Sequence, residues 1–123
     1  MISLVSKCKQ FYKIFNTQDL NNIKNLLSND IILENSKGLI IANGINEFLK
    51  ENLKLFNNVE SIVVSPLKLY KAENKFPNES YNVTGTVIAI IDVKINSDKN
   101  ERFLEIFEFD RKNKIKYIKV YKG

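Results

Sequence analysis

The sequence predicts an α+β fold in which a bent antiparallel sheet covers amphipathic helices from the first part of the chain. The first observation is the alternation over residues 81–95, where every odd position from Tyr81 to Ile95 is apolar or glycine, the pattern of a strand with one buried face. The second is that three segments before residue 59 carry apolar residues at helical spacing. A straight strand of that length would outreach most small domains, so we expect a bend at Gly85.

Three helices are expected before the main part of the sheet. The first runs from Ile2 to Asn16, and its apolar stripe is Leu4, Cys8, Phe11, Tyr12 and Phe15. Asp19 is a suitable N-cap for a short second helix, which Asn29-Asp30 would end and whose apolar residues are Leu20, Ile23, Leu26 and Leu27. The third helix starts at Asn43-Gly44, and its apolar stripe is Ile45, Phe48, Leu49, Leu53 and Phe56.

Strands are expected over residues 31–35, 39–42, 59–71, 81–95, 103–110 and 115–121. In the first of them, Ile31, Leu33 and Asn35 share the face turned to the core, whereas Glu34 lies on the opposite face. Pro66 marks an edge position or a bulge in the third. Three helical segments followed by four meandering strands form an α+β plan, with an antiparallel second half of the sheet.

Composition limits both the size of the fold and its chemistry. The 123 residues, 44% of them hydrophobic, fit one domain over residues 1–123. The chain has no histidine, which excludes Ser-His and Cys-His catalysis and imidazole bases. Cys8 is the single cysteine, so no internal disulfide forms, and we expect it to be a small buried residue. The sequence shows no secretory signal and no membrane-spanning run, so we expect a cytoplasmic protein without a membrane partner.

A metal site or another cofactor is not expected. Without histidine and with one cysteine, a metal site would need Asp30, Glu34 and Glu105 to converge. Asp30 is predicted to lie in a loop and Glu34 on the outer face, so these carboxylates are not expected to meet. The glycines at positions 38 and 44 are not followed by the Gly-Lys-Ser/Thr of a phosphate-binding loop.

The net charge of +5 raises the question of nucleic acid binding. The basic residues are densest over residues 111–122, but lysines along a solvated hairpin edge commonly prevent edge-to-edge association. The run RFLEIFEF from Arg102 has the aromatics of an RNA-binding strand, but it has no glycine and two acids where phosphate would lie. We therefore expect no nucleic acid partner.

The order of these elements resembles the nuclear transport factor 2-like (NTF2-like) superfamily, which includes ketosteroid isomerases and SnoaL-like polyketide cyclases. The resemblance rests on FYKIFNTQDLNNIKNLLSNDIILEN, NGINEFLKENLK and FEFDRKNKIKYIKVYKG, and it covers the chain from about Cys8 to Gly123. It implies the cystatin-like α+β cone, a strongly bent sheet wrapped around the N-terminal helices. It also implies an apolar pocket at the open end and, as in many members, a homodimer formed through the outer sheet face.

Three catalytic positions of the ketosteroid isomerases can be compared with this chain. Counting from Asp19-Leu20, the helix-one tyrosine falls on Phe11 and the strand base falls on Asn35, while the final hairpin places the protonated acid on Glu105. Tyr12 and Glu34 lie next to the first two positions, but recovering both needs shifts in opposite directions. The isomerase reaction is therefore not expected, and Asn35 is left to form hydrogen bonds to a ligand.

Glu105 is the main candidate for chemistry. It lies at two-residue spacing among Phe103, Phe107 and Phe109, so a carboxylate is expected on a buried aromatic face. Burial without a cation would raise its pKa and make it a proton donor or acceptor. The alternatives are that this face is solvated or that a lysine pairs with Glu105. Asn35 could instead be a strand-end asparagine that bonds to the backbone.

Two functions follow from these residues. In the first, the chain binds an apolar or aromatic small molecule, with acid-base chemistry at Glu105 assisted by Asn35 and Tyr12. The predicted pocket residues are Phe11, Phe15, Leu33, Phe48, Val83, Phe103, Phe107, Ile118 and Val120. In the second, the cone is filled by its own side chains and the chain is an interaction module. Its outer sheet face then binds a partner or a second copy through Ile62, Val64, Ile88, Ile90 and Ile106.

Overall fold

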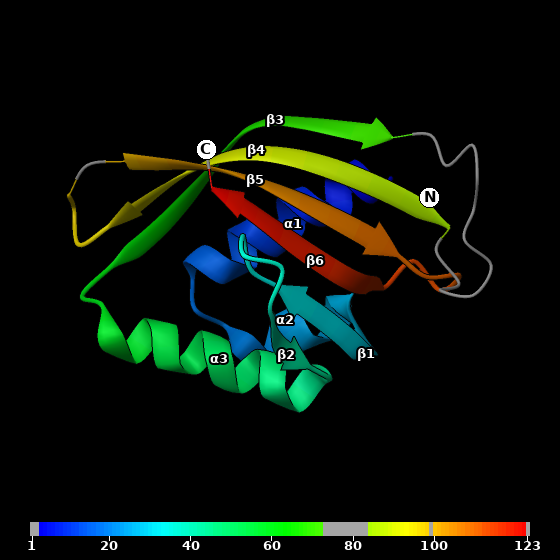
Figure 1. Cartoon of the computed structure of the whole chain (residues 1–123), viewed down its shortest axis with the longest axis horizontal. Helices are drawn as coiled ribbons and strands as arrows, with labels where there is room; N and C mark the ends of the chain where they lie inside the picture. The colour runs from blue at the N-terminus through cyan, green and yellow to red at the C-terminus, as the bar shows by residue number, and fades with distance from the viewer. Residues whose placement is uncertain (1–2, 73–83, 99, 123) are drawn as a thin grey trace.

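The computed structural model describes residues 3–72, 84–98 and 100–122. The first half of the described chain contains α1 (Leu4–Asn16), α2 (Leu20–Ile23), the 3-10 helix η1 (Lys24–Leu26), β1 (Leu27–Glu34), β2 (Ile40–Asn43) and α3 (Ile45–Asn58). The second half contains β3 (Ile62–Ala72), β4 (Gly85–Ile95), β5 (Asn100–Phe109) and β6 (Ile115–Lys122). The predicted α+β fold is confirmed (Figure 1).

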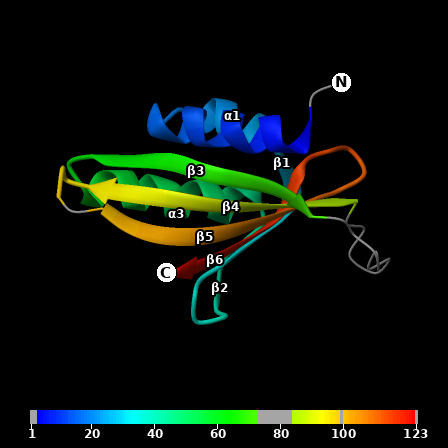
Figure 2. The same cartoon turned by 90° about the horizontal axis from the view of Figure 1, so that it is seen from above.

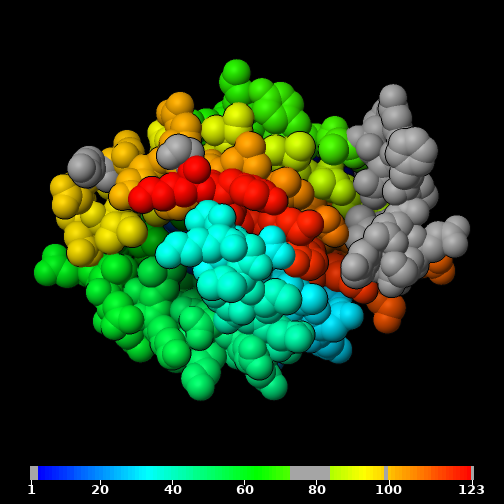
Figure 3. All heavy atoms as spheres, viewed as in Figure 1, coloured from blue at the N-terminus to red at the C-terminus, as the bar shows by residue number. Residues whose placement is uncertain are grey.

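One sheet of six strands, in the order β2-β1-β6-β5-β4-β3, curves over α1 and α3, which both lie on its inner face (Figures 1 and 2). The strands from β3 to β6 form the predicted antiparallel meander. The pairing of β1 with β6 is parallel, so the sheet is mixed at this point. Figure 3 shows the β1–β2 segment, in cyan, lying between β6, in red, and α3, in green, on the face turned to the viewer.

The core lies between the inner face of the sheet and the helices. Val87, Ala89, Ile91 and Val93 of β4 are all buried, as the alternation of this strand predicts. On the same face of β5, Phe107 is fully buried. Its ring makes edge contacts with the α1 rings, at centroid distances of 5.5 Å to Phe11 and 5.6 Å to Tyr12. These aromatic contacts fix α1 against the centre of the sheet.

Gly85 begins β4 and allows α1 to approach the sheet. A Cβ atom at this position would lie 2.3 Å from Cδ1 of Leu4, so a larger residue would require that side chain to move. The bend predicted at this glycine involves residues outside the described part of the chain and stays a prediction; in the structure Gly85 leaves room for the start of α1. Tyr81 and Val83, predicted to belong to the same strand, lie outside the described residues.

The prediction for the second helix was wrong at its C-terminal end. Helix α2 stops at Ile23, a 3-10 turn follows, and Leu27 is already the first residue of β1. Asn29 and Asp30 therefore lie in the strand rather than in a turn before it. Leu27 is buried and opposes Ile115 of β6, so its apolar side chain packs as part of the sheet and not as part of a helix.

The prediction that Ile62 and Val64 lie on the outer face was also wrong. They oppose Ile95 and Val93 of β4 in register, so they share the inner face with those residues, and both are buried. Val63, between them, is exposed instead. The other members of the predicted outer face, Ile88, Ile90 and Ile106, do lie opposite to the buried residues of β4 and β5.

One residue of the predicted stripe on α3 was misplaced. Leu53 is 49% exposed, whereas its neighbour Asn52 is 8% exposed and lies between Phe48 and Phe56 on the buried side. Spacing of four residues puts these three side chains on one face of the helix. A polar amide therefore occupies the position that a leucine was expected to fill.

Candidate functional site

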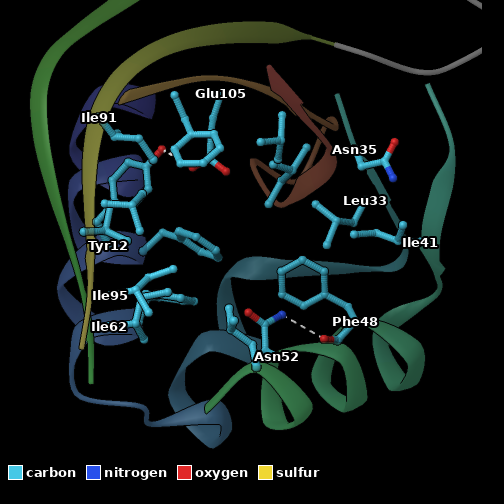
Figure 4. Close-up of a pocket in the computed structure, with 18 residues that line it drawn as sticks. Tyr12, Leu33, Asn35, Ile41, Phe48, Asn52, Ile62, Ile91, Ile95 and Glu105 are labelled. Atoms are coloured by element: carbon cyan, nitrogen blue, oxygen red, sulfur yellow. Dashed lines mark hydrogen bonds between the residues drawn. The ribbon is translucent and has the colours of Figure 1, made fainter. Parts of the chain in front are cut away.

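A cavity of about 310 Å³ lies between the inner face of the sheet and the helices α1 and α3 (Figure 4). Its walls are almost entirely apolar, with side chains from all six strands on the sheet side. The polar side chains on its wall are Tyr12, Asn35, Asn52 and Glu105. Its size lies at the lower end of the range of small-molecule pockets, and a few polar groups in an apolar wall are typical of such sites.

Glu105 projects into this cavity from the middle of β5. It opposes Ala89 of β4 and Val120 of β6, which places it on the inner face. The structure contradicts the alternative that this face is solvated, because Phe107 on the same face is fully buried. Glu105 itself is half-buried, since its carboxylate borders the cavity. The cavity wall around the carboxylate is apolar, so the carboxylate is largely desolvated although it is not closed off from water.

The partner of Glu105 is Tyr12 of α1. The Tyr12 hydroxyl donates a hydrogen bond of 2.7 Å to Oε1 of Glu105. Burial raises the pKa of Glu105 to about 7, and this hydrogen bond offsets part of that increase. The pKa of Tyr12 is raised by its own burial and by the charge of Glu105, so the hydroxyl keeps its proton at neutral pH. The pair therefore combines a carboxyl group that titrates near neutral pH with a permanent donor.

No cation neutralises Glu105 from within the described residues. The ion pairs of that part of the chain join other side chains, and burial and Tyr12 are the causes of the altered pKa of Glu105. The nearby Cys8 thiol is fully buried, and its pKa is raised by that burial and then by Glu105. Cys8 therefore stays protonated and supplies no charge.

Asn35 is not brought together with Glu105 and Tyr12. It follows β1 and lies across the cavity from Glu105 (Figure 4). Its Oδ1 accepts hydrogen bonds of 3.0 Å from the backbone N–H groups of Lys37 and Leu39, which closes the turn between β1 and β2. This is the alternative that the sequence left open, an asparagine that organises the backbone at a strand end.

Glu34, the other candidate for the lost base, lies on the outer face. Its Oε1 accepts a hydrogen bond of 2.7 Å from the Tyr117 hydroxyl, and Ile32 opposes Tyr117 across the same parallel pair of strands. Leu33, between Ile32 and Glu34, lines the cavity instead. A proton abstracted inside the cavity would therefore not reach Glu34.

Most of the predicted pocket residues border the cavity. Those on its wall are Phe11, Phe15, Leu33, Phe48, Phe103, Ile118 and Val120. Phe107 does not border it, because the rings of Phe11 and Tyr12 contact Phe107 from the helix side and leave it in the core. Val83 lies outside the described residues.

The wall residues that were not predicted from the sequence are Ile41, Asn52, Leu55, Ile62, Val64, Ile91, Val93 and Ile95. The available signal for Asn52 was its position four residues after Phe48 and four before Phe56, a polar residue within an apolar stripe. Ile62 and Val64 carried no such signal, since Val63 between them is apolar too.

The described part of the chain offers neither a cluster of metal ligands nor a membrane-spanning helix. Within these residues no three cysteine, aspartate or glutamate side chains are grouped closely enough to hold a metal ion. Across the same residues, no helix has both the length and the apolar character needed to cross a membrane.

No protein-family model matches the chain, and no curated protein matches it in sequence. Several solved structures, in contrast, resemble the chain in fold. An NTF2-like protein of unknown function from Cytophaga hutchinsonii matches with a TM-score of 0.75 at 15% identity, over 100% of this chain and 92% of that one. A putative polyketide cyclase from Sinorhizobium meliloti matches with a TM-score of 0.73 at 11% identity, over 98% and 94%.

The Orange Carotenoid Protein of Anabaena, solved with canthaxanthin, matches with a TM-score of 0.79 at 14% identity. The match covers 98% of this chain and 36% of that larger one. At such identities these likenesses show the fold, which is the NTF2-like fold that the sequence predicted.

Proposed function

We propose that this chain, with its NTF2-like fold, binds a small and largely apolar molecule in the cavity and uses Glu105 as a proton donor or acceptor toward it. The observation that carries the proposal is the Tyr12–Glu105 hydrogen bond inside an apolar cavity of about 310 Å³. A buried carboxyl group without a cation lowers the stability of a protein, and such groups are concentrated at functional sites. The names of two similar proteins, a polyketide cyclase and a carotenoid protein, support an apolar ligand.

The chemistry follows from the two protonation states of Glu105. With a pKa of about 7, the group is present in both forms at neutral pH, which is favourable for general acid-base catalysis. The protonated form donates a hydrogen bond to an oxygen of the ligand, and the ionised form accepts a proton from it. Tyr12 remains a donor throughout and holds Oε1 in place. Because Asn35 has no basic group, a second base for an isomerase reaction is not part of the proposal.

A calorimetric titration with para-methoxybiphenyl tests the proposal. This probe is uncharged and its ether oxygen only accepts hydrogen bonds, so it binds best when Glu105 is protonated. We expect its affinity to fall as the pH rises through about 7, with proton uptake on binding, and we expect Glu105→Gln to remove both effects. Glu108→Gln, a control on the outer face beside Lys119, should behave as the unmodified chain does. A pH profile that is unchanged by Glu105→Gln would contradict the proposal.

The proposal also includes a homodimer formed through the outer sheet face. This face carries an apolar patch, which we call the outer patch and which consists of Tyr70, Ile88, Ile90, Leu104, Ile106 and Tyr121. Tyr70 is 49% exposed and Tyr121 is 42% exposed, which is high for large aromatic side chains on one face. The two-fold pairing of such a patch would leave the cavity on the opposite face accessible. On the sequence alone, we place the protein in the cytoplasm.

A further inference from the structure

Asn52 is a second polar group of the cavity, and the proposed function does not use it. The residue lies in the middle of α3 and is 8% exposed. Its Nδ2 donates a hydrogen bond of 2.8 Å to the backbone carbonyl of Phe48, one turn earlier. Since a carbonyl oxygen can only accept, this bond fixes which end of the amide faces the backbone. The other end, Oδ1, is turned toward the cavity (Figure 4).

The Oδ1 atom has no donor among the described residues. The hydrogen bond of Asn52 in that part of the chain is the one through Nδ2, and the neighbouring wall residues on the helix side, such as Phe48 and Leu55, have no side-chain donors. An amide oxygen that borders an apolar cavity without a donor from the protein makes the fold less stable than a paired one would. A leucine at this position would avoid that cost and would extend the stripe of Phe48 and Phe56.

We infer that Asn52 determines the specificity of the cavity, by accepting a hydrogen bond from a hydroxyl or N–H group of the bound molecule. The inference rests on the proposed function, because it concerns the same ligand. Asn52 belongs to α3 and Glu105 to β5, and the two side chains lie on opposite walls of the cavity (Figure 4). The occupant is therefore an apolar molecule with a polar group at each end, and the group at the α3 end is a donor.

The size of the cavity and the chemistry of Oδ1 limit the choice of ligand further. A volume of 310 Å³ corresponds to about ten water molecules, which suits a two- or three-ring compound rather than a long chain lipid. A site that is built to bond a donor rejects an analogue without it, because the buried oxygen is then left unpaired. A hydroxyl group should thus be preferred over a methyl group of nearly the same size.

The test uses a matched pair of probes, para,para′-dihydroxybiphenyl and para-hydroxy-para′-methylbiphenyl, which differ only in the group at one end. We expect the chain to bind the dihydroxy probe about tenfold more tightly, the equivalent of one hydrogen bond. The variant Asn52→Leu should bind both equally. Leu53→Ala, on the exposed side of the same helix, should keep the preference. Equal preferences in the chain and in Asn52→Leu would overturn the inference.

Thermal unfolding of the variant without ligand gives a second, independent readout. If Oδ1 is kept for a ligand, Asn52→Leu should raise the melting temperature, since residues retained for binding are often unfavourable for stability. If the amide is structural, the same change should lower the melting temperature, and that result would overturn the inference. The two proposals can fail separately. If the probes bind with a pH profile that depends on Glu105 but show no preference that depends on Asn52, only the role of Asn52 is contradicted. Binding of no probe at all contradicts both.

Discussion

The Tyr12 hydroxyl and the Glu105 carboxylate, which are 93 residues apart in the chain, form a hydrogen bond of 2.7 Å inside an apolar cavity. Helix α1 supplies the donor and the centre of the sheet supplies the acceptor. The bond thus links the two layers of the fold at the place where the proposed ligand binds. Its strength depends on the protonation state of Glu105, so the packing of the layers and the chemistry of the site are coupled.

Replacing Tyr12 by phenylalanine should raise the pKa of Glu105 above its present value of about 7, because the hydrogen bond that favours the ionised form is lost. We also expect the free energy of unfolding at about pH 8 to fall by roughly 1.5–3 kcal/mol, the range for a hydrogen bond to a charged group. A carboxyl NMR titration measures the pKa, and urea unfolding measures the stability.

The chain offers a matched control for this change. The Tyr117 hydroxyl donates a hydrogen bond of the same 2.7 Å length to Glu34, but on the outer face. Tyr117→Phe should leave the titration of Glu105 where it is. If both variants shifted the pKa of Glu105 alike, or neither did, the direct effect of the Tyr12 hydroxyl would be disproved.

The stability of the chain should depend on pH through Glu105. Its pKa is about 7 in the folded state against an ordinary value of 4.5, so the folded chain holds this proton more tightly than the unfolded chain does. The free energy of unfolding should therefore decrease as the pH rises from about 4.5 to about 7, and stay level above that. The full decrease is about 3 kcal/mol at most, since water in the cavity can hydrate the carboxylate.

Urea unfolding at several pH values checks this dependence. In Glu105→Gln the contribution should vanish, and the variant should gain stability over the unmodified chain as the pH is raised. Glu108→Gln, whose carboxylate lies near Lys119 on the outer face, keeps the original profile. A stability that rises between about pH 5 and pH 7 in the unmodified chain but not in Glu105→Gln would have the wrong sign for a buried carboxyl group.

The sequence allowed the fold to be predicted because local periodicity carried most of the information. The alternation in β4 and the stripe on α1 identify their buried faces without knowledge of their neighbours. Glu105 was predicted to lie on the inner face because Phe107 and Phe109 share its side of the strand, but Leu104 and Ile106 make the opposite side apolar as well, so the alternation in β5 is weaker than in β4. The parallel pairing of β1 with β6 could not be predicted, because it joins segments distant in sequence and has no local pattern.

The errors in the candidate site arose where neighbouring residues were equally apolar. Ile62, Val63 and Val64 give no alternation, so the face of β3 is decided by its register with β4, which sequence does not show. On α3, Asn52 and Leu53 differ by one position, and the leucine was predicted to be buried because it is apolar and lies three residues before Phe56. On β3 the register with β4 decided which side chains are buried, and on α3 the position around the helix did. In neither case did the hydrophobicity of the single residue decide it.

Phe107 and Phe103 were both predicted to line the pocket, and their different positions lead to different expectations. Phe107 is fully buried against two aromatic rings, so Phe107→Ala should lower the free energy of unfolding by about 3–5 kcal/mol. Phe103 borders the cavity and is only half-buried, so Phe103→Ala should cost clearly less. Urea unfolding of the two variants compares them directly. Equal losses would show that Phe103 is as much a core residue as Phe107.

The outer patch should mediate self-association. Ile90 opposes Leu104 on one side and Lys68 on the other, so Ile90→Lys would place a new charge in the patch beside an existing lysine. Burying two such charges in a two-fold interface is unfavourable, and we expect the variant to be monomeric. Sedimentation velocity measures the association state of the unmodified chain and of the variant at the same concentrations.

Leu53→Lys is the control, since Leu53 is also apolar and is 49% exposed, but lies on α3, away from the sheet. This variant should associate as the unmodified chain does, because the added charge stays in water. If Ile90→Lys remained dimeric while Leu53→Lys became monomeric, the interface would involve α3 instead of the outer patch.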